Sequence, residues 1–78
     1  MMTKGEYRVG KTFNPSNDDM VAAIKSVAGD FIDLVEKIES DFKSVAGNER
    51  GRLKSLAQTE IESAAMWAVK AATKREPE

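Results

Sequence analysis

The apolar residues in the first half of the chain recur at helical spacing. Between about residues 18 and 45 they stand alternately three and four positions apart. The stripe comprises Val21, Ile24, Ala28, Phe31, Val35, Ile38, Phe42 and Val45. This period is that of a heptad seam along one α-helix. The pattern therefore predicts a first helix of roughly 40 Å, at 1.5 Å per residue.

A second helical pattern fills residues 52–73. Its seam is alanine-rich and comprises Leu53, Ala57, Ile61, Ala64, Ala68 and Ala71. Between the two patterns, Gly47 is a candidate left-handed helix cap. Because the connection is short, the helices should be antiparallel neighbours. We predict an all-α fold, an antiparallel hairpin of two long helices over residues 16–73.

The two ends of the chain lack this periodicity. Residues 1–15 contain Gly5, Gly10 and Pro15, which predicts an extended N-terminal arm. Residues 74–78 form a polar tail. The expected organisation is therefore an arm over 1–15, a hairpin over 16–73 and a tail over 74–78.

The second helix is apolar on more than one face. Leu56, Met66, Trp67 and Val69 lie away from its seam, and residues 64–72 are apolar nearly all round. A hairpin covers only one side of such a helix. A chain of 78 residues also builds only a small core by itself. The surplus apolar surface therefore predicts a homo-oligomer.

Composition excludes several kinds of function. The chain has no Cys and no His, which removes the commonest nucleophile pairs and metal ligands. We therefore expect no enzyme, no metal and no cofactor. A formal net charge of −1 argues against DNA as a partner. No signal peptide or membrane-length apolar run is visible, so we expect a cytoplasmic protein without a membrane partner.

Two motifs in the sequence resemble known functional sites but have simpler interpretations. Residues 5–12 match the Walker A string, but that motif needs a preceding strand and a helix starting at its Lys-Thr end. Neither is expected here. Asp30 and Asp33 form an i, i+3 carboxylate pair, which is more typical of a solvated helix face than of a metal site.

The arm combines aromatic and basic residues. Tyr7 and Phe13 stand among three cations of the first 15 residues. Such aromatics either dock on the protein's own helices or stack on nucleotide bases. Both interpretations stay open, and Lys25 and Arg52 in the helices could each be a solvated charge.

Three stretches of the sequence carry a resemblance to a known family. They are Phe-Asn-Pro-Ser at 13–16, Ile-Lys at 24–25, and the pattern over 53–71 with its core Ala-x-Met-Trp-Ala-Val-Lys at 64–70. In these stretches the chain resembles the small phage proteins that act as anti-CBASS sponges, which sequester the cyclic oligonucleotide messengers of a bacterial immune system. The resemblance covers about residues 7–73. It implies helical hairpins assembled as hexamers, each a trimer of dimers, which bind these messengers without cleaving them.

The resemblance also implies two kinds of binding site. One takes cyclic dinucleotides such as cyclic GMP-AMP, with Phe13 stacking on a base and Lys25 meeting a phosphate. Phe13 stands where the family has Tyr, so Tyr7 is an alternative stacking residue. The other takes cyclic trinucleotides through Asn14 and Arg52. If the protein is phage-encoded, it would act in the host bacterial cytoplasm.

Two other functions remain as alternatives. The hairpin could be an oligomeric protein-interaction module with no nucleotide ligand. An enzyme that degrades the messenger is disfavoured, because the chain lacks His and Cys.

Overall fold

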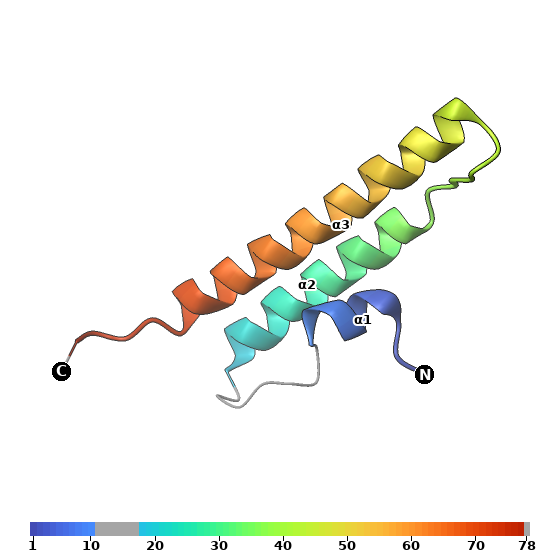
Figure 1. Cartoon of the computed structure of the whole chain (residues 1–78). Coiled ribbons are helices and arrows are strands. Elements are labelled where there is room, and N and C mark those ends of the chain that lie inside the picture. The colour runs from blue at the N-terminus through green and yellow to red at the C-terminus, as the bar shows by residue number, and fades with distance from the viewer. Residues whose placement is uncertain (11–17, 78) are drawn as a thin grey trace.

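The computed structural model describes residues 1–10 and 18–77, and its helices are α1 (Lys4–Val9), α2 (Asp19–Glu36) and α3 (Val45–Ala72). Figure 1 shows α2 and α3 side by side and antiparallel, with α1 lying against the pair. This arrangement confirms the predicted all-α antiparallel hairpin. Of the residues proposed from sequence to bind ligand, Phe13 and Asn14 lie outside the described part of the chain.

The expectation of a wholly extended N-terminal arm is wrong, because residues 4–9 are helical. Thr3 caps α1 by accepting a hydrogen bond from the Glu6 amide at 3.0 Å, and the Glu6 carboxylate accepts one from the Thr3 amide at 2.9 Å. This reciprocal capping box stabilises even a short helix. Gly10 ends α1 with φ 64° and ψ 48°, a left-handed conformation that glycine adopts without strain.

The connection between the long helices lies earlier in the chain than predicted. α2 starts at Asp19, close to the expected start near residue 18, but it ends at Glu36 rather than near Val45, and α3 begins at Val45 rather than Arg52. The Asp41 carboxylate accepts hydrogen bonds from the amides of Lys43 at 2.8 Å and Ser44 at 3.0 Å. Such side-chain bonds to nearby backbone favour a turn over a continuous helix.

The start of α3 is fixed by a cap that the apolar pattern does not show. The Ser44 hydroxyl accepts a hydrogen bond from the Gly47 amide at 2.9 Å. Gly47 therefore lies in the first turn of α3 and is not the cap of the preceding helix. A Cβ on Gly47 would lie 2.5 Å from the Asp41 carboxylate oxygens, so a side chain at this position would displace the carboxylate that bonds the turn.

The buried face of α2 is rotated relative to the predicted seam. Val21 and Val35 are buried as expected, but their buried companions are Lys25, Gly29 and Ile32. In α3 the buried positions are Gly47, Gln58 and Ala65, none of which belongs to the predicted seam. The predicted Phe31 is instead 52% exposed.

The molecule is a single layer of helices. Its principal extents are 56 × 28 × 13 Å, and the thinnest is close to the diameter of one helix. Accordingly the buried hydrophobic residues among those described are only Val21, Ile32, Val35 and Ala65. Large apolar side chains stay exposed, including Met66 at 58% and Trp67 at 61%. One chain therefore leaves much of its apolar surface uncovered.

Candidate ligand-binding site

A partly polar cavity lies where α1 meets the hairpin, and we call it the α1 pocket. It has a volume of about 470 Å³. Its lining comprises Arg8 and Val9 of α1, Lys25 of α2, and Thr59, Glu62, Ser63, Ala65, Met66 and Val69 of α3. All three helices thus contribute to one cavity, which is lined by two cations, one carboxylate, hydroxyl groups and apolar side chains. A cavity of this composition suits a ligand with both charged and apolar parts.

α1 approaches the hairpin closely because two glycines face each other. A Cβ on Gly5 would lie 1.9 Å from the carbonyl oxygen of Gly29, so no side chain fits at this position. The Gly5 amide also donates a hydrogen bond of 2.7 Å to the Asp33 carboxylate. The close contact fixes the position of α1, and with it the wall of the α1 pocket.

Lys25, which is predicted to meet a phosphate, lines this pocket. Its side chain is only 9% exposed, and its ammonium donates a hydrogen bond of 3.2 Å to the Gly10 carbonyl oxygen at the end of α1. Lys25 therefore also helps to hold the end of α1. A ligand phosphate at this site would meet an ammonium group that already lies against α1.

Arg8 is a second cation of the α1 pocket, and its position was not foreseen. Its Nε donates a hydrogen bond of 2.8 Å to Glu62 Oε2, and its Nη2 donates to the same oxygen. The pair joins α1 to α3 across 54 positions of sequence. No local pattern relates two residues so far apart, so only the arrangement of the helices reveals the pair.

A polar cluster buries Gln58 beneath the other end of α1. Gln58 is 1% exposed and donates to the Ile32 carbonyl at 3.3 Å and to Glu36 Oε1 at 3.0 Å. Lys4 donates to the same Glu36 oxygen at 2.8 Å and to Gln58 Oε1 at 3.0 Å. The hydrogen bond from Gln58, followed by that from Lys4, lowers the pKa of Glu36 from 4.5 to about 2. The cluster therefore carries an ionised carboxylate that anchors α1.

Tyr7, the alternative stacking residue, lies on α1 but does not line the α1 pocket. Its side chain is 77% exposed. It is therefore available to a ligand or another subunit, and it does not dock on the hairpin of its own chain.

Arg52 lies away from Lys25, in a separate cavity that we call the connection pocket. This cavity of about 420 Å³ is also lined by Lys4 and Lys54. Arg52 is in the second turn of α3 and its Nε donates a hydrogen bond of 2.6 Å to Glu49. Glu36 of α2 also lines the connection pocket. Along α2, Glu36 lies roughly 16 Å from Lys25 at 1.5 Å per residue, so the connection pocket is well separated from Lys25. The structure thus places the two predicted cations in different pockets.

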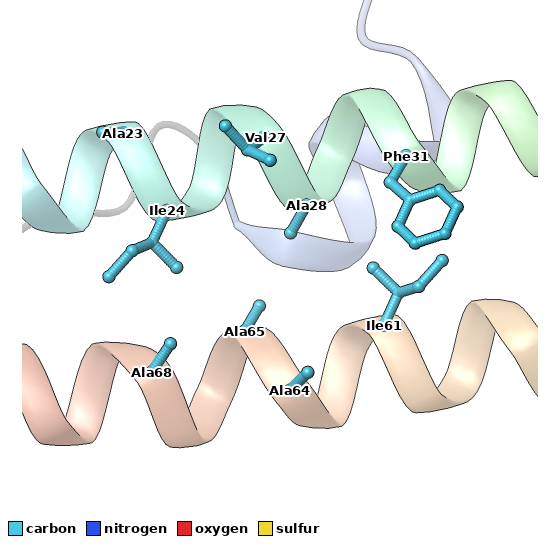
Figure 2. A pocket seen from close by; sticks show the side chains of 9 residues that line it. All are labelled: Ala23, Ile24, Val27, Ala28, Phe31, Ile61, Ala64, Ala65 and Ala68. Atoms are coloured by element: carbon cyan, nitrogen blue, oxygen red, sulfur yellow. The ribbon is translucent and has the colours of Figure 1, made fainter.

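A third cavity, the apolar groove, runs between α2 and α3 and has a volume of about 450 Å³. Its lining comprises Ala23, Ile24, Val27, Ala28, Phe31, Ile61, Ala64, Ala65 and Ala68. Figure 2 shows Ile24 and Phe31 of α2 and Ile61 of α3 pointing into the space between the two helices, with α1 behind them. The small alanines of α3 leave this space unfilled, so the groove is an apolar surface that α1 does not cover.

Two general features complete the description of residues 1–10 and 18–77. In these ranges no group of acidic side chains has the arrangement of a metal site. No helix there is both long and apolar enough to cross a membrane.

The fold and the α1 pocket define a small helical-hairpin binding protein, in which a short N-terminal helix completes a polar cavity. Residues 5–73 match the family of the Acb2/Tad1 hairpin domain. Since this is most of the chain, the protein belongs to that family, the anti-CBASS sponges, and the resemblance seen in the sequence is confirmed. Membership implies binding of cyclic oligonucleotides in general. Comparisons with curated proteins and with solved structures give no match.

Proposed function

We propose that this protein sequesters cyclic dinucleotides and cyclic trinucleotides without cleaving them. In this proposal it is a phage protein that protects the phage from an immune response in the bacterial cytoplasm. The observation that supports binding of a cyclic dinucleotide is the position of Lys25 in the wall of the α1 pocket. A sponge needs affinity and no reacting group, which suits a chain without His or Cys.

The cyclic dinucleotide site is proposed at Lys25, with Phe13 or Tyr7 stacking on a base. A cyclic dinucleotide carries two phosphates and two aromatic faces, so its site needs cations and stacking surfaces. A stacked base is worth roughly 1–3 kcal/mol. Lys25 lies in a pocket that apolar side chains also line, which supports this assignment, and exposed Tyr7 is accessible from outside the protomer.

The cyclic trinucleotide site is proposed at Asn14 and Arg52. Arg52 shares the connection pocket with Lys4 and Lys54, which pair with Glu36 of the same pocket, so the three cations together exceed its one acid and favour an anionic ligand. Asn14 precedes α2 in the sequence, whereas Arg52 lies beside the end of α2. We therefore place this site between subunits, where residues from opposite ends of two hairpins meet.

Assembly into a hexamer is part of the proposal. The apolar groove and the exposed Met66 and Trp67 are surfaces that a second copy of the chain would cover. The same groove supports the second candidate, an oligomeric protein-interaction module without a nucleotide ligand. The two candidates differ in whether pure protein binds a cyclic oligonucleotide.

The deciding experiment is calorimetric titration of the full chain with a panel of cyclic dinucleotides and trinucleotides. Lys25→Met keeps an unbranched buried side chain and removes the charge, so it should weaken dinucleotide binding while Lys37→Met does not. Arg52→Ala should remove trinucleotide binding and leave dinucleotide binding intact. Equal loss of both ligands with the oligomer intact would refute two separate sites.

The same samples also test for cleavage. After denaturation of the protein, chromatography should recover the ligand intact, and recovery of linear products would refute a sponge. If the parent protein binds no member of the panel, the interaction module becomes the better proposal.

A further inference from the structure

The Arg8–Glu62 ion pair lies in the wall of the α1 pocket, beside the proposed dinucleotide site. Both Nε and Nη2 of Arg8 donate to one oxygen of Glu62, and the first of these bonds measures 2.8 Å. The Arg8 side chain is 23% exposed and that of Glu62 is 45% exposed. The guanidinium is thus partly sheltered, and its partner carboxylate lies closer to solvent.

The charges of this pocket do not match a dianionic ligand while the ion pair is closed. Among the described residues that line the pocket, Lys25 and Arg8 are the cations and Glu62 is the acid. Arg8 is paired with Glu62, and Lys25 is the other cation of the described lining. A ligand with two phosphates would then meet one cation and one nearby carboxylate.

We infer that Arg8 is a second phosphate-binding residue of this site, and that Glu62 holds its guanidinium until a ligand phosphate takes the place of the carboxylate. The inference rests on the proposed dinucleotide site at Lys25. A guanidinium presents paired N–H donors that fit a carboxylate and a phosphate equally well. Glu62 therefore acts as an internal competitor, and it lowers the affinity for every anion that needs Arg8.

The exchange is compatible with the way α1 is attached. Lys4 bonded to Glu36 at 2.8 Å, the Gly5 amide bonded to Asp33 at 2.7 Å, and the close contact of Gly5 with Gly29 all hold α1 independently of Glu62. Arg8 can therefore change its partner while α1 stays in place. If the ion pair served only to anchor α1, removal of the Glu62 charge would loosen α1 and would not strengthen ligand binding.

The test is a titration of cyclic GMP-AMP into the full-length parent protein, Lys25→Met and four further variants. Glu62→Gln keeps the size of the side chain and removes its charge, and we expect binding tighter by on the order of fivefold, the strength of a partly exposed ion pair. Glu60→Gln is the matched control, because it removes the same charge from an exposed position of α3 outside the pocket. Arg8→Ala should weaken binding roughly tenfold or more. Arg8→Lys should restore only part of the loss, since Lys lacks the paired donors.

The results separate this inference from the function on which it rests. The inference is supported if Glu62→Gln binds more tightly than the parent, Glu60→Gln binds as the parent does, and Arg8→Ala binds more weakly. If the parent protein binds and Lys25→Met does not, but Glu62→Gln binds no better than Glu60→Gln, the exchange is refuted and the site at Lys25 stands. If neither the parent nor Glu62→Gln binds, the dinucleotide site and the exchange are refuted together.

Discussion

Gly5 of α1 and Gly29 of α2 meet backbone to backbone, so that a Cβ on Gly5 would lie 1.9 Å from the Gly29 carbonyl oxygen. This contact brings the Gly5 amide within 2.7 Å of the Asp33 carboxylate. Arg8, one turn further along α1, then lies against Glu62 of α3. The position of the short helix, and therefore the shape of the α1 pocket, depends on two residues without side chains.

Gly5→Ala should force α1 away from the hairpin. The added methyl group meets backbone, which cannot move aside, and overpacking of this kind costs about 1–3 kcal/mol in stability. Urea unfolding should show the loss, and limited trypsin digestion should cleave faster after Arg8. Gly51→Ala is the control, since its Cβ would make an ordinary contact of 3.5 Å with Ser40 and should stabilise α3 by up to about 1 kcal/mol. Unchanged stability and digestion of Gly5→Ala would contradict the close docking of α1.

The Glu36 cluster should make stability depend on acidic pH. Folding lowers the pKa of Glu36 from 4.5 to about 2, so its contribution is fully present above pH 4.5 and is lost as the pH falls towards 2. The side chain is 45% exposed, and solvent screening limits the contribution to about 1 kcal/mol or less. Unfolding of the parent and of Glu36→Gln at pH 7 and pH 3 should show their difference shrinking at the lower pH.

Asp41 also makes the protein less stable in acid, because hydrogen bonds from the backbone amides of Lys43 and Ser44 lower the pKa of its carboxyl group. The Glu36→Gln variant should therefore still lose stability in acid through Asp41. Only the part that Glu36→Gln abolishes belongs to the cluster under α1. A difference between parent and Glu36→Gln that grows in acid would contradict the assignment.

Gln58→Leu should destabilise the protein even though Leu is apolar and fits a helix. Gln58 is 1% exposed and bonds the Ile32 carbonyl, Glu36 and Lys4, so a Leu at this position removes three hydrogen bonds from the cluster. The expected loss is about 1–3 kcal/mol by urea unfolding. Ser55→Ala, an exposed change on the same helix, should alter stability by no more than about 0.5 kcal/mol. A Gln58→Leu protein as stable as the parent would show that the cluster contributes no net stability.

Ala64→Glu should break the assembly that we propose. Ala64 lines the apolar groove, and a charge there would prevent a second copy from covering it. Light scattering should give a multiple of 8.6 kDa for the parent and a smaller mass for Ala64→Glu, while Ala46→Glu in the first turn of α3 behaves as the parent does. A monomeric parent would refute the hexamer.

The sequence alone determined that the chain is a helical hairpin, because apolar residues at helical spacing act within a few turns of chain. It also led to the correct family through local strings of residues, and it named Lys25, which the structure places in a pocket. It failed at the connection, where the apolar spacing continued past Glu36 although Asp41 and Ser44 bind nearby backbone and end the regular structure. The spacing of apolar residues does not record these side-chain hydrogen bonds.

Only the tertiary structure decided which faces of the helices turn inward. α2 is apolar on adjacent faces, and the spacing of apolar residues does not show which of them is buried. α1 packs on the face that carries Lys25 and Gly29, so that face is buried, whereas Phe31 points toward α3 but lies beside an open groove. The pairing of Arg8 with Glu62 was likewise beyond the sequence, because two residues 54 positions apart share no helical period and meet only when three helices pack together.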